Sequence, residues 1–237
     1  EGMNITTFGK AIASYERSLI SANSNFDKWY FGKNQNALND KEKDGFEIFM
    51  GKGNCVSCHL INDKDALFFD NRLHNTGIGY ADSMGILSQK KTRVQLAPGE
   101  YVEVDSSIIS SVNQQKKLND LGLYRITENP DHRWMFKTPS LRNISLTSPY
   151  MHNGIFSNLE EVIEFYNEGG FENSLLSPMI KKLNLSINEK ENLKLFLESL
   201  EGDNIEILIS DALAEPVGDL TKNDPNWAND KDMGYNK

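Results

Sequence analysis

Both cysteines of this chain fall within one five-residue motif, Cys55-Val56-Ser57-Cys58-His59. Two cysteines that are separated by two residues and followed directly by histidine form the attachment pattern of a c-type haem. The thiols add across the two vinyl groups of the porphyrin, and the imidazole then binds the iron from one side. The motif therefore predicts one covalent haem c, with His59 as the proximal ligand.

The motif also indicates the compartment in which the protein is completed. It excludes a disulfide framework, because both cysteines belong to the motif and no third cysteine is present. Haem c is attached outside the cytoplasm, so we expect a periplasmic or otherwise exported protein. Nothing at the N-terminus resembles a signal peptide, and we expect that a leader or a longer chain preceded residue 1.

The formal net charge of -9 restricts the partners. Nucleic acid is disfavoured because phosphate contacts require clustered Lys and Arg. A basic, soluble redox partner protein fits the charge, although the same charge also serves solubility alone. No apolar run approaches the roughly 18 residues that cross a bilayer, so no transmembrane segment is expected.

Hydrophobic periodicity predicts two helices before the haem motif. The first spans Ile5–Leu19, with one apolar face made by Phe8, Ile12, Tyr15 and Leu19. The second begins at an Asn39-Asp40 cap and runs to about Met50. The glycines of Gly51-Lys52-Gly53 end it and let the backbone approach the porphyrin closely.

Residues 61–132 show little periodicity and are interrupted by Gly77, Gly79, Gly85, Pro98 and Gly99. A loop-rich region that wraps around a haem is the expectation here. Within it, the polar stretch 106–118 is predicted to be exposed.

Two capping boxes predict helices near the C-terminus. The first is Ser157–Glu160, for a helix over about 158–168 that stops at Gly169-Gly170. The second is Ser186–Glu189, for a helix that ends at Gly202 and presents one apolar face, formed by Leu193, Phe196, Leu197 and Leu200. The predicted fold is mainly α: a cytochrome c-like haem domain over 1–201, with long ordered loops and few short strands, and an acidic irregular tail over 202–237.

The residue on the distal side of the iron decides the chemistry. The chain offers several candidates: His74, His132, His152, Met135, Met151, Met179 and Tyr166. A methionine thioether raises the reduction potential and suits electron transfer. A tyrosine phenolate is a hard anion that stabilises ferric iron and lowers the potential.

Longer motifs connect the chain to a known family. The run from Phe136 to Gly154 is highly specific, and Leu159–Tyr166, Phe8–Arg17 and Gly51–Cys55 accompany it. Together they resemble the C-terminal haem domain of bacterial dihaem cytochrome c peroxidases and of the related MauG-type enzymes, over roughly residues 5 to 201. The resemblance implies thioether bonds at Cys55 and Cys58.

The resemblance also implies a distal ligand. In the peroxidases a methionine lies fourteen residues after the histidine of the Pro-Tyr-x-His motif, and MauG-type proteins have tyrosine there. Fourteen residues after His152 stands Tyr166, so the chain resembles the MauG type at its iron. Met151 is the main rival, and a buried tyrosine with another partner is the alternative without a haem role.

Further site residues follow from the same likeness. The family binds Ca²⁺ between its two haem domains, and the backbone carbonyls of Thr147 and Pro149 match two of its ligands. Lys137 and Arg142 are candidates for pairing with haem propionates, or are surface charges. His152 is a candidate for orienting a propionate or a water network.

Family members carry two CxxCH motifs, whereas this chain carries one. We therefore expect a partner haem domain or subunit, in which peroxide would react, while the six-coordinate haem of this chain relays electrons or oxidising equivalents. The alternatives are a monohaem electron carrier without catalysis of its own, and a haem-based sensor of small ligands. Peroxidase and protein-modifying oxidase are not distinguished by the sequence.

Overall fold

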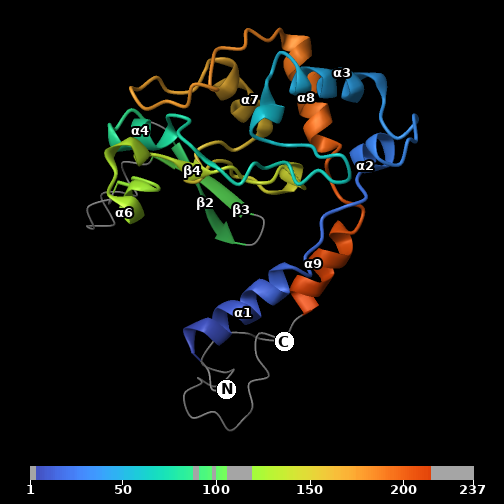
Figure 1. The fold of residues 1–237 in the computed structure, drawn as a ribbon, viewed down its shortest axis with the longest axis horizontal. Helices are drawn as coiled ribbons and strands as arrows, with labels where there is room; N and C mark the ends of the chain where they lie inside the picture. The colour runs from blue at the N-terminus through green and yellow to red at the C-terminus, as the bar shows by residue number, and fades with distance from the viewer. Residues whose placement is uncertain (1–3, 88–90, 98–99, 106–118, 215–237) are drawn as a thin grey trace. The chain divides into compact units, whose positions relative to one another are not determined.

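The computed structural model describes residues 4–87, 91–97, 100–105 and 119–214, and these residues are mostly helical (Figure 1). The α-helices are α1 (Ile5–Glu16), α2 (Asn25–Tyr30), α3 (Asp40–Met50), α4 (Ile78–Ser83), α6 (Tyr124–Thr127), α7 (Leu159–Asn167), α8 (Ile187–Glu198) and α9 (Ile205–Ala214). The 3-10 turns are η1 (Cys55–Ser57), η2 (Pro130–His132) and η3 (Ile144–Leu146). The strands are β1 (Leu73–His74), β2 (Lys91–Ala97), β3 (Glu100–Asp105) and β4 (Phe136–Lys137). The expected mainly α fold with few short strands is confirmed.

The chain divides into two compact units, one of residues 22–202 and one of residues 1–21 with 203–237. The structure thus separates residues 1–21 from the haem domain that was predicted to start at residue 1. In the smaller unit the Asn204 amide donates to the carbonyl of Ile20 at 2.8 Å. No helix of the described part of the chain is long and apolar enough to cross a membrane.

The expectation of an irregular tail from residue 202 is wrong at its start, because Ile205–Ala214 forms α9. This segment is rich in Ile, Leu and Ala and contains neither Gly nor Pro, so its local helix propensity is high. The acidic, Asn-rich composition of the tail as a whole had favoured an irregular structure, so helix α9 was not predicted. The part of the tail from Pro216 onward lies outside the described residues.

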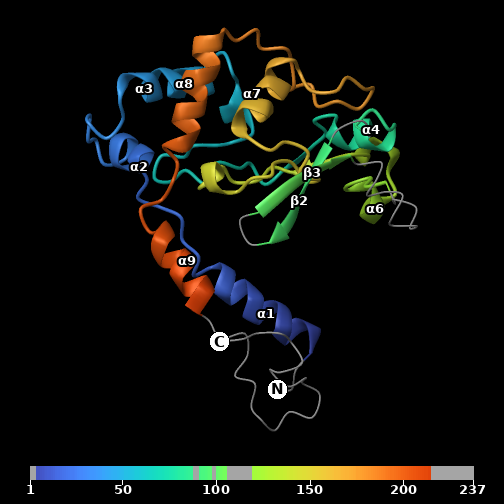
Figure 2. The same ribbon diagram turned by 180° about the vertical axis from the view of Figure 1, so that it is seen from behind.

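Helices α3 and α8 pack against each other and form the framework of the larger unit (Figure 2). Both begin as predicted: Asn39 and Glu42 form one capping box, and Ser186 and Glu189 the other. Gly45 of α3 faces the α8 backbone so closely that any Cβ would collide with the carbonyl of Asn192. Only a glycine therefore permits this helix crossing.

A cluster of aromatic rings fills the core beneath these helices. Phe26 of α2 is fully buried, and its ring lies 5.3 to 6.4 Å from six others, those of Trp29, Tyr30, Phe31, Phe46, Phe68 and Phe196. Five of these pairs are tilted or edge-to-face and the pair with Tyr30 is stacked, and such ring pairs stabilise the fold beyond the burial of their area. Helix α2 itself was not predicted, because its N-cap Ser24 lies within the polar run Asn23-Ser24-Asn25.

Helix α7 begins one residue later than the predicted capping box implied. Its N-cap is Asn158, whose side chain accepts from the Glu161 backbone N–H at 2.9 Å. Asn and Ser are equally good caps, so their order along the chain could not decide between them. The predicted stop at Gly169 and Gly170 is confirmed, since both adopt positive φ angles.

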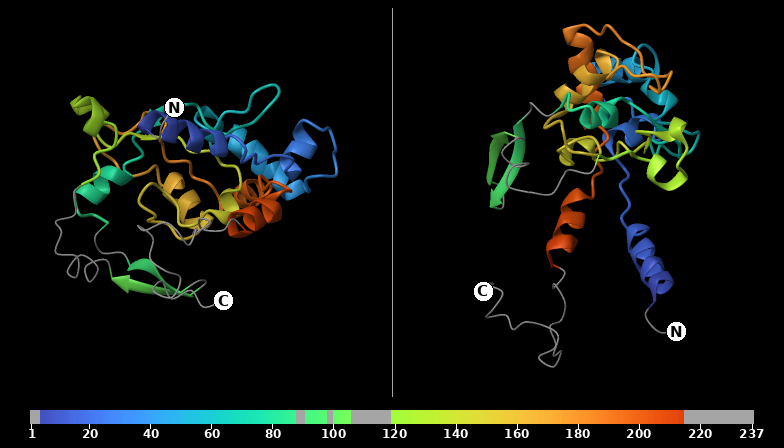
Figure 3. Two further views of the ribbon diagram at one scale, coloured as in Figure 1. Left: turned by 90° about the horizontal axis from the view of Figure 1, so that it is seen from below. Right: turned by 90° about the vertical axis from the view of Figure 1, so that its left-hand side faces the viewer.

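The region predicted to be loop-rich contains a β-hairpin as well as helix α4. Strands β2 and β3 pair antiparallel, with Val94 opposite Val102 (Figure 3). Apolar and polar residues alternate only in part along these two strands, so the sequence showed no sustained period-two signal there. Pro98, Gly99 and the stretch 106–118 lie outside the described residues.

Candidate haem site

The attachment motif follows directly on the end of α3. Gly51 caps that helix, and the N–H of Gly53 donates back to the Ile48 carbonyl at 2.7 Å. A Cβ at Gly53 would lie 2.8 Å from that carbonyl oxygen and 3.3 Å from the Cys55 sulfur. The tight turn that this glycine allows therefore fixes where the first cysteine sits.

The motif itself forms one turn, η1. The backbone N–H groups of Cys58 and His59 both donate to the Cys55 carbonyl, at 3.2 and 2.9 Å. The two sulfurs are unbonded thiols, as thioether attachment requires. Burial raises the pKa of the Cys55 thiol to about 12, so this sulfur is uncharged at neutral pH.

His59 is oriented as a metal ligand. Its Nδ1 lies 2.7 Å from the carbonyl oxygen of Phe68 and must donate to it, because a carbonyl only accepts. The bond fixes the tautomer in which Nε2 keeps its lone pair for a metal. Burial lowers the pKa of the imidazole, against the opposing pull of the Phe68 and Pro139 carbonyls and of Asp70. The neutral ring is the form that binds iron.

Tyr166 of α7 reaches the same site. Its ring is partly buried in the core and lies edge-on to Phe165 at 5.1 Å. Burial raises the pKa of its phenol, and the neighbouring sulfurs of Cys55 and Cys58 raise it further.

The other distal candidates have different surroundings. Met151 packs partly buried against the core, with a positive φ of 68°. His152 is exposed and stacks on Phe136, with ring centroids 3.6 Å apart. His74 contacts Asp70, and His132 contacts the Thr127 hydroxyl at 3.0 Å. Met135 and Met179 are partly buried.

Asp70 is a site residue that the sequence analysis missed. Its carboxylate holds the His74 ring at 2.7 Å, and both groups lie within 4.8 Å of the Cys58 sulfur. Burial alone would raise the pKa of Asp70, but bonds from His74 and from the Arg72 backbone outweigh it and hold the pKa low. The predicted thioether bond at Cys58 would leave its sulfur unavailable to a separate metal ion, so these three groups would border the predicted haem site.

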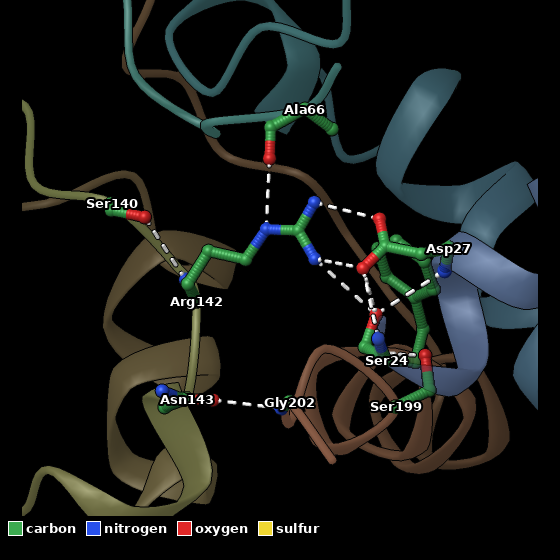
Figure 4. A network of polar contacts seen from close by, with 9 residues as sticks. Ser24, Asp27, Ala66, Ser140, Arg142, Asn143, Ser199 and Gly202 are labelled. Carbon is green, nitrogen blue, oxygen red and sulfur yellow. Dashed lines mark hydrogen bonds and ion pairs between the residues drawn. The ribbon is translucent and has the colours of Figure 1, made fainter. Parts of the chain in front are cut away.

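Arg142 has a partner other than the propionates expected from the sequence. Its guanidinium binds Asp27 in a two-pronged ion pair, at 2.6 and 2.8 Å, and its Nε donates to the Ala66 carbonyl at 2.8 Å (Figure 4). Both charged side chains are largely buried. The charge of Arg142 is thus met by Asp27, and we do not propose it as a propionate ligand.

Lys137 is exposed on β4, and its ammonium lies 5.6 Å from the centre of the Phe69 ring. Thr147 and Pro149 are exposed residues in the turn after η3. The propionate role of Lys137 and the calcium role of Thr147 and Pro149 stay predictions.

The Asp27–Arg142 pair predicts a dependence of stability on acid pH. Burial would raise the pKa of Asp27, but the bonds from Arg142 and Ser24 outweigh it and hold the pKa below its usual range. A carboxyl whose folded pKa is depressed stabilises the fold above its unfolded pKa of about 4, and this contribution is lost as the pH falls through the folded value. In urea titrations, the free-energy gap between wild type and Asp27→Asn should shrink from about pH 7 to about pH 3. A gap of constant size would contradict this assignment.

Comparison with known proteins identifies the relatives of the chain. No protein-family model matches it. The cytochrome-c peroxidase IdrP2 of Denitromonas iodatirespirans is 36% identical over 199 residues, which are 83% of this chain and 49% of that protein. The methylamine utilization protein MauG of Methylorubrum extorquens is 29% identical over 193 residues, 81% of this chain and 43% of MauG.

Over about 80% of its length the chain is homologous to cytochrome c peroxidases and MauG proteins. It spans about half the length of these relatives. The solved structure of a MauG-like protein associated with microbial copper homeostasis is 29% identical to this chain, with a TM-score of 0.62. The alignment covers 86% of this chain and 55% of the MauG-like protein. The dihaem peroxidase BthA of Burkholderia thailandensis, at 19% identity and a TM-score of 0.52, shares the fold.

The residues present fit a haem c. A covalent haem needs two thiols and a neutral imidazole, and the chain supplies the thiols on one turn and an imidazole whose Nδ1 is bonded to a carbonyl. The Tyr166 phenol packs against the same core as Cys55. Cys55, Cys58 and His59 would hold the porphyrin and its iron. Tyr166, from a helix more than one hundred residues later, is the distal candidate with the most support.

Proposed function

We propose that this chain is the six-coordinate c-type haem domain of a peroxidase-type or MauG-like oxidoreductase. When bound, haem c supplies one-electron redox chemistry at its iron. Tyr166 and Cys55 pack against the same core, and both haem-binding cysteines help to raise the pKa of the Tyr166 phenol; these two observations carry the proposal. The homology to cytochrome c peroxidases and MauG proteins supports the same reaction class, with hydrogen peroxide as the electron acceptor.

His59 and Tyr166 would be the two protein ligands of the haem iron. Burial keeps His59 neutral, and the Phe68 carbonyl aims its ring by accepting a hydrogen bond from Nδ1. The buried phenol of Tyr166 holds its proton until a cationic partner compensates the charge of the phenolate, and ferric iron is such a partner. A hard anionic ligand stabilises the ferric state and lowers the potential.

An iron with two protein ligands has no vacancy for peroxide. The domain would therefore relay electrons or oxidising equivalents to a peroxide-reactive haem on a second domain or subunit. The relatives, which are about twice as long as this chain, have room for such a domain. We further propose an exported protein that exchanges electrons with a soluble redox partner, and a Ca²⁺ site that uses the Thr147 and Pro149 carbonyls.

Two measurements on the native protein test this division of labour. Intact-mass spectrometry should find a second covalent haem, in the same polypeptide or in a copurifying subunit. In a peroxide assay with a reduced c-type donor, the two-haem preparation should turn over and this chain alone should stay at background. One haem with no peroxide turnover in the native protein would indicate an electron carrier instead. Rapid carbon monoxide binding by the reduced chain would indicate a small-ligand sensor.

A further inference from the structure

The turn that holds the proximal histidine is strained. Phe68 is fully buried and has a φ of +54°, a left-handed conformation that a bulky residue adopts only when its surroundings impose it. This conformation aims its carbonyl at His59 Nδ1. The orientation of His59 thus depends on whatever keeps Phe68 in place.

Three kinds of contact hold the turn. The N–H of Phe68 donates to the Leu60 carbonyl at 3.2 Å. Its ring packs against Phe26 and Phe49, with centroids 5.3 and 6.0 Å away. The third contact comes from Arg142, whose guanidinium lies over the Phe68 ring at 5.1 Å and whose Nε binds the carbonyl of Ala66, two residues earlier.

Arg142 is itself fixed from the opposite side. Asp27 takes both of its terminal nitrogens, and Ser24 secures that carboxylate through its N–H and its hydroxyl, each at 2.9 Å. Figure 4 shows the guanidinium between two segments of the chain, the loop that contains Ala66 and the start of α2. One planar group with a fixed fork of donors makes all these bonds at once, which a lysine cannot do.

We propose that Arg142 is a positioning residue for the proximal ligand, acting through Ala66 and Phe68 on His59. The clamp of Ser24, Asp27 and Arg142 keeps the Phe68 carbonyl in line with Nδ1. That bond strengthens the imidazole as a donor to iron and so favours the ferric state. This inference rests on the haem of the proposed function but not on Tyr166 or on a partner domain.

The test compares Arg142→Lys with Arg133→Lys. Arg133 lies over the Tyr124 ring at the same 5.1 Å and serves as the matched control. In Arg142→Lys, the midpoint potential of the haem should move to a more positive value and the iron–histidine stretching frequency should fall. The same variant of the haem-free chain should lose the solvent protection of the His59 Nδ1 proton in nitrogen-15 NMR. Arg133→Lys should change none of these.

The inference would be overturned if Arg142→Lys attached haem normally and kept the potential, the stretching frequency and the Nδ1 protection of wild type. The Asp27–Arg142 ion pair would then be purely structural. If Arg142→Lys fails to fold, Asp27→Asn replaces it, because it keeps the guanidinium but removes its charge partner. The same shifts in weaker form are then expected, and their absence would contradict the inference. If the wild-type chain failed to attach haem, the proposed function would be wrong. The NMR comparison of the haem-free wild type with Arg142→Lys would still decide the role of Arg142.

Discussion

A chain with alanine at both Cys55 and Cys58 should emerge from a haem c-assembling host without covalent haem. These are the only two cysteines of the sequence, and both thiols lie on the turn that precedes His59. Thioether bonds have no other source. Haem staining after denaturing electrophoresis, together with the intact mass, should show a complete loss of the haem.

Single variants and a sulfur control sharpen this result. Cys58→Ala should keep haem through one thioether bond, with a changed absorption band from the unreacted vinyl group. Met84→Ala, which removes an exposed sulfur elsewhere, should keep the full haem content. Covalent haem in the double alanine variant would refute the attachment site.

Phe26→Ala should destabilise the larger unit by about 3–5 kcal/mol. The side chain is fully buried and contacts six aromatic rings, so its removal loses transfer free energy and leaves a cavity that the rigid rings cannot close. One of those rings belongs to Phe68, which places the cavity next to the haem site. Urea unfolding monitored by tryptophan fluorescence measures the effect.

Phe8→Ala is the matched control for this variant. Phe8 is 56% exposed on α1, and alanine is the better helix former. Its effect should stay within about 0.5 kcal/mol. Equal losses in the two variants would show that Phe26 does not anchor the core.

Local signals in the sequence predicted much of the fold. The caps at Asn39 and Ser186 and the apolar face of α8 were readable because they rest on contacts within a few residues. Helix α2 and the start of α9 were missed where composition masked the pattern. The β2–β3 hairpin was missed because apolar and polar residues do not alternate strictly along either strand.

The site divides in the same way. The attachment motif is local and was predicted directly, whereas Tyr166 emerged only through the family resemblance, since nothing in its own neighbourhood indicates a ligand. Asp27 and Arg142 lie 115 positions apart, so the sequence could not predict their ion pair and left Arg142 as a propionate candidate or a surface charge. Charge indicates that a partner exists, but tertiary structure decides which one.

The ferric spectrum of the haem-loaded chain before and after Tyr166→Phe tests the account most directly. Wild type should show a six-coordinate ferric haem with a phenolate-to-iron charge-transfer feature and a matching tyrosinate band in resonance Raman. In Tyr166→Phe that feature should vanish and the iron should become five-coordinate or bind water, while the covalent haem remains. Identical spectra of the two proteins would contradict the His59–Tyr166 assignment and leave Met151 as the ligand to examine.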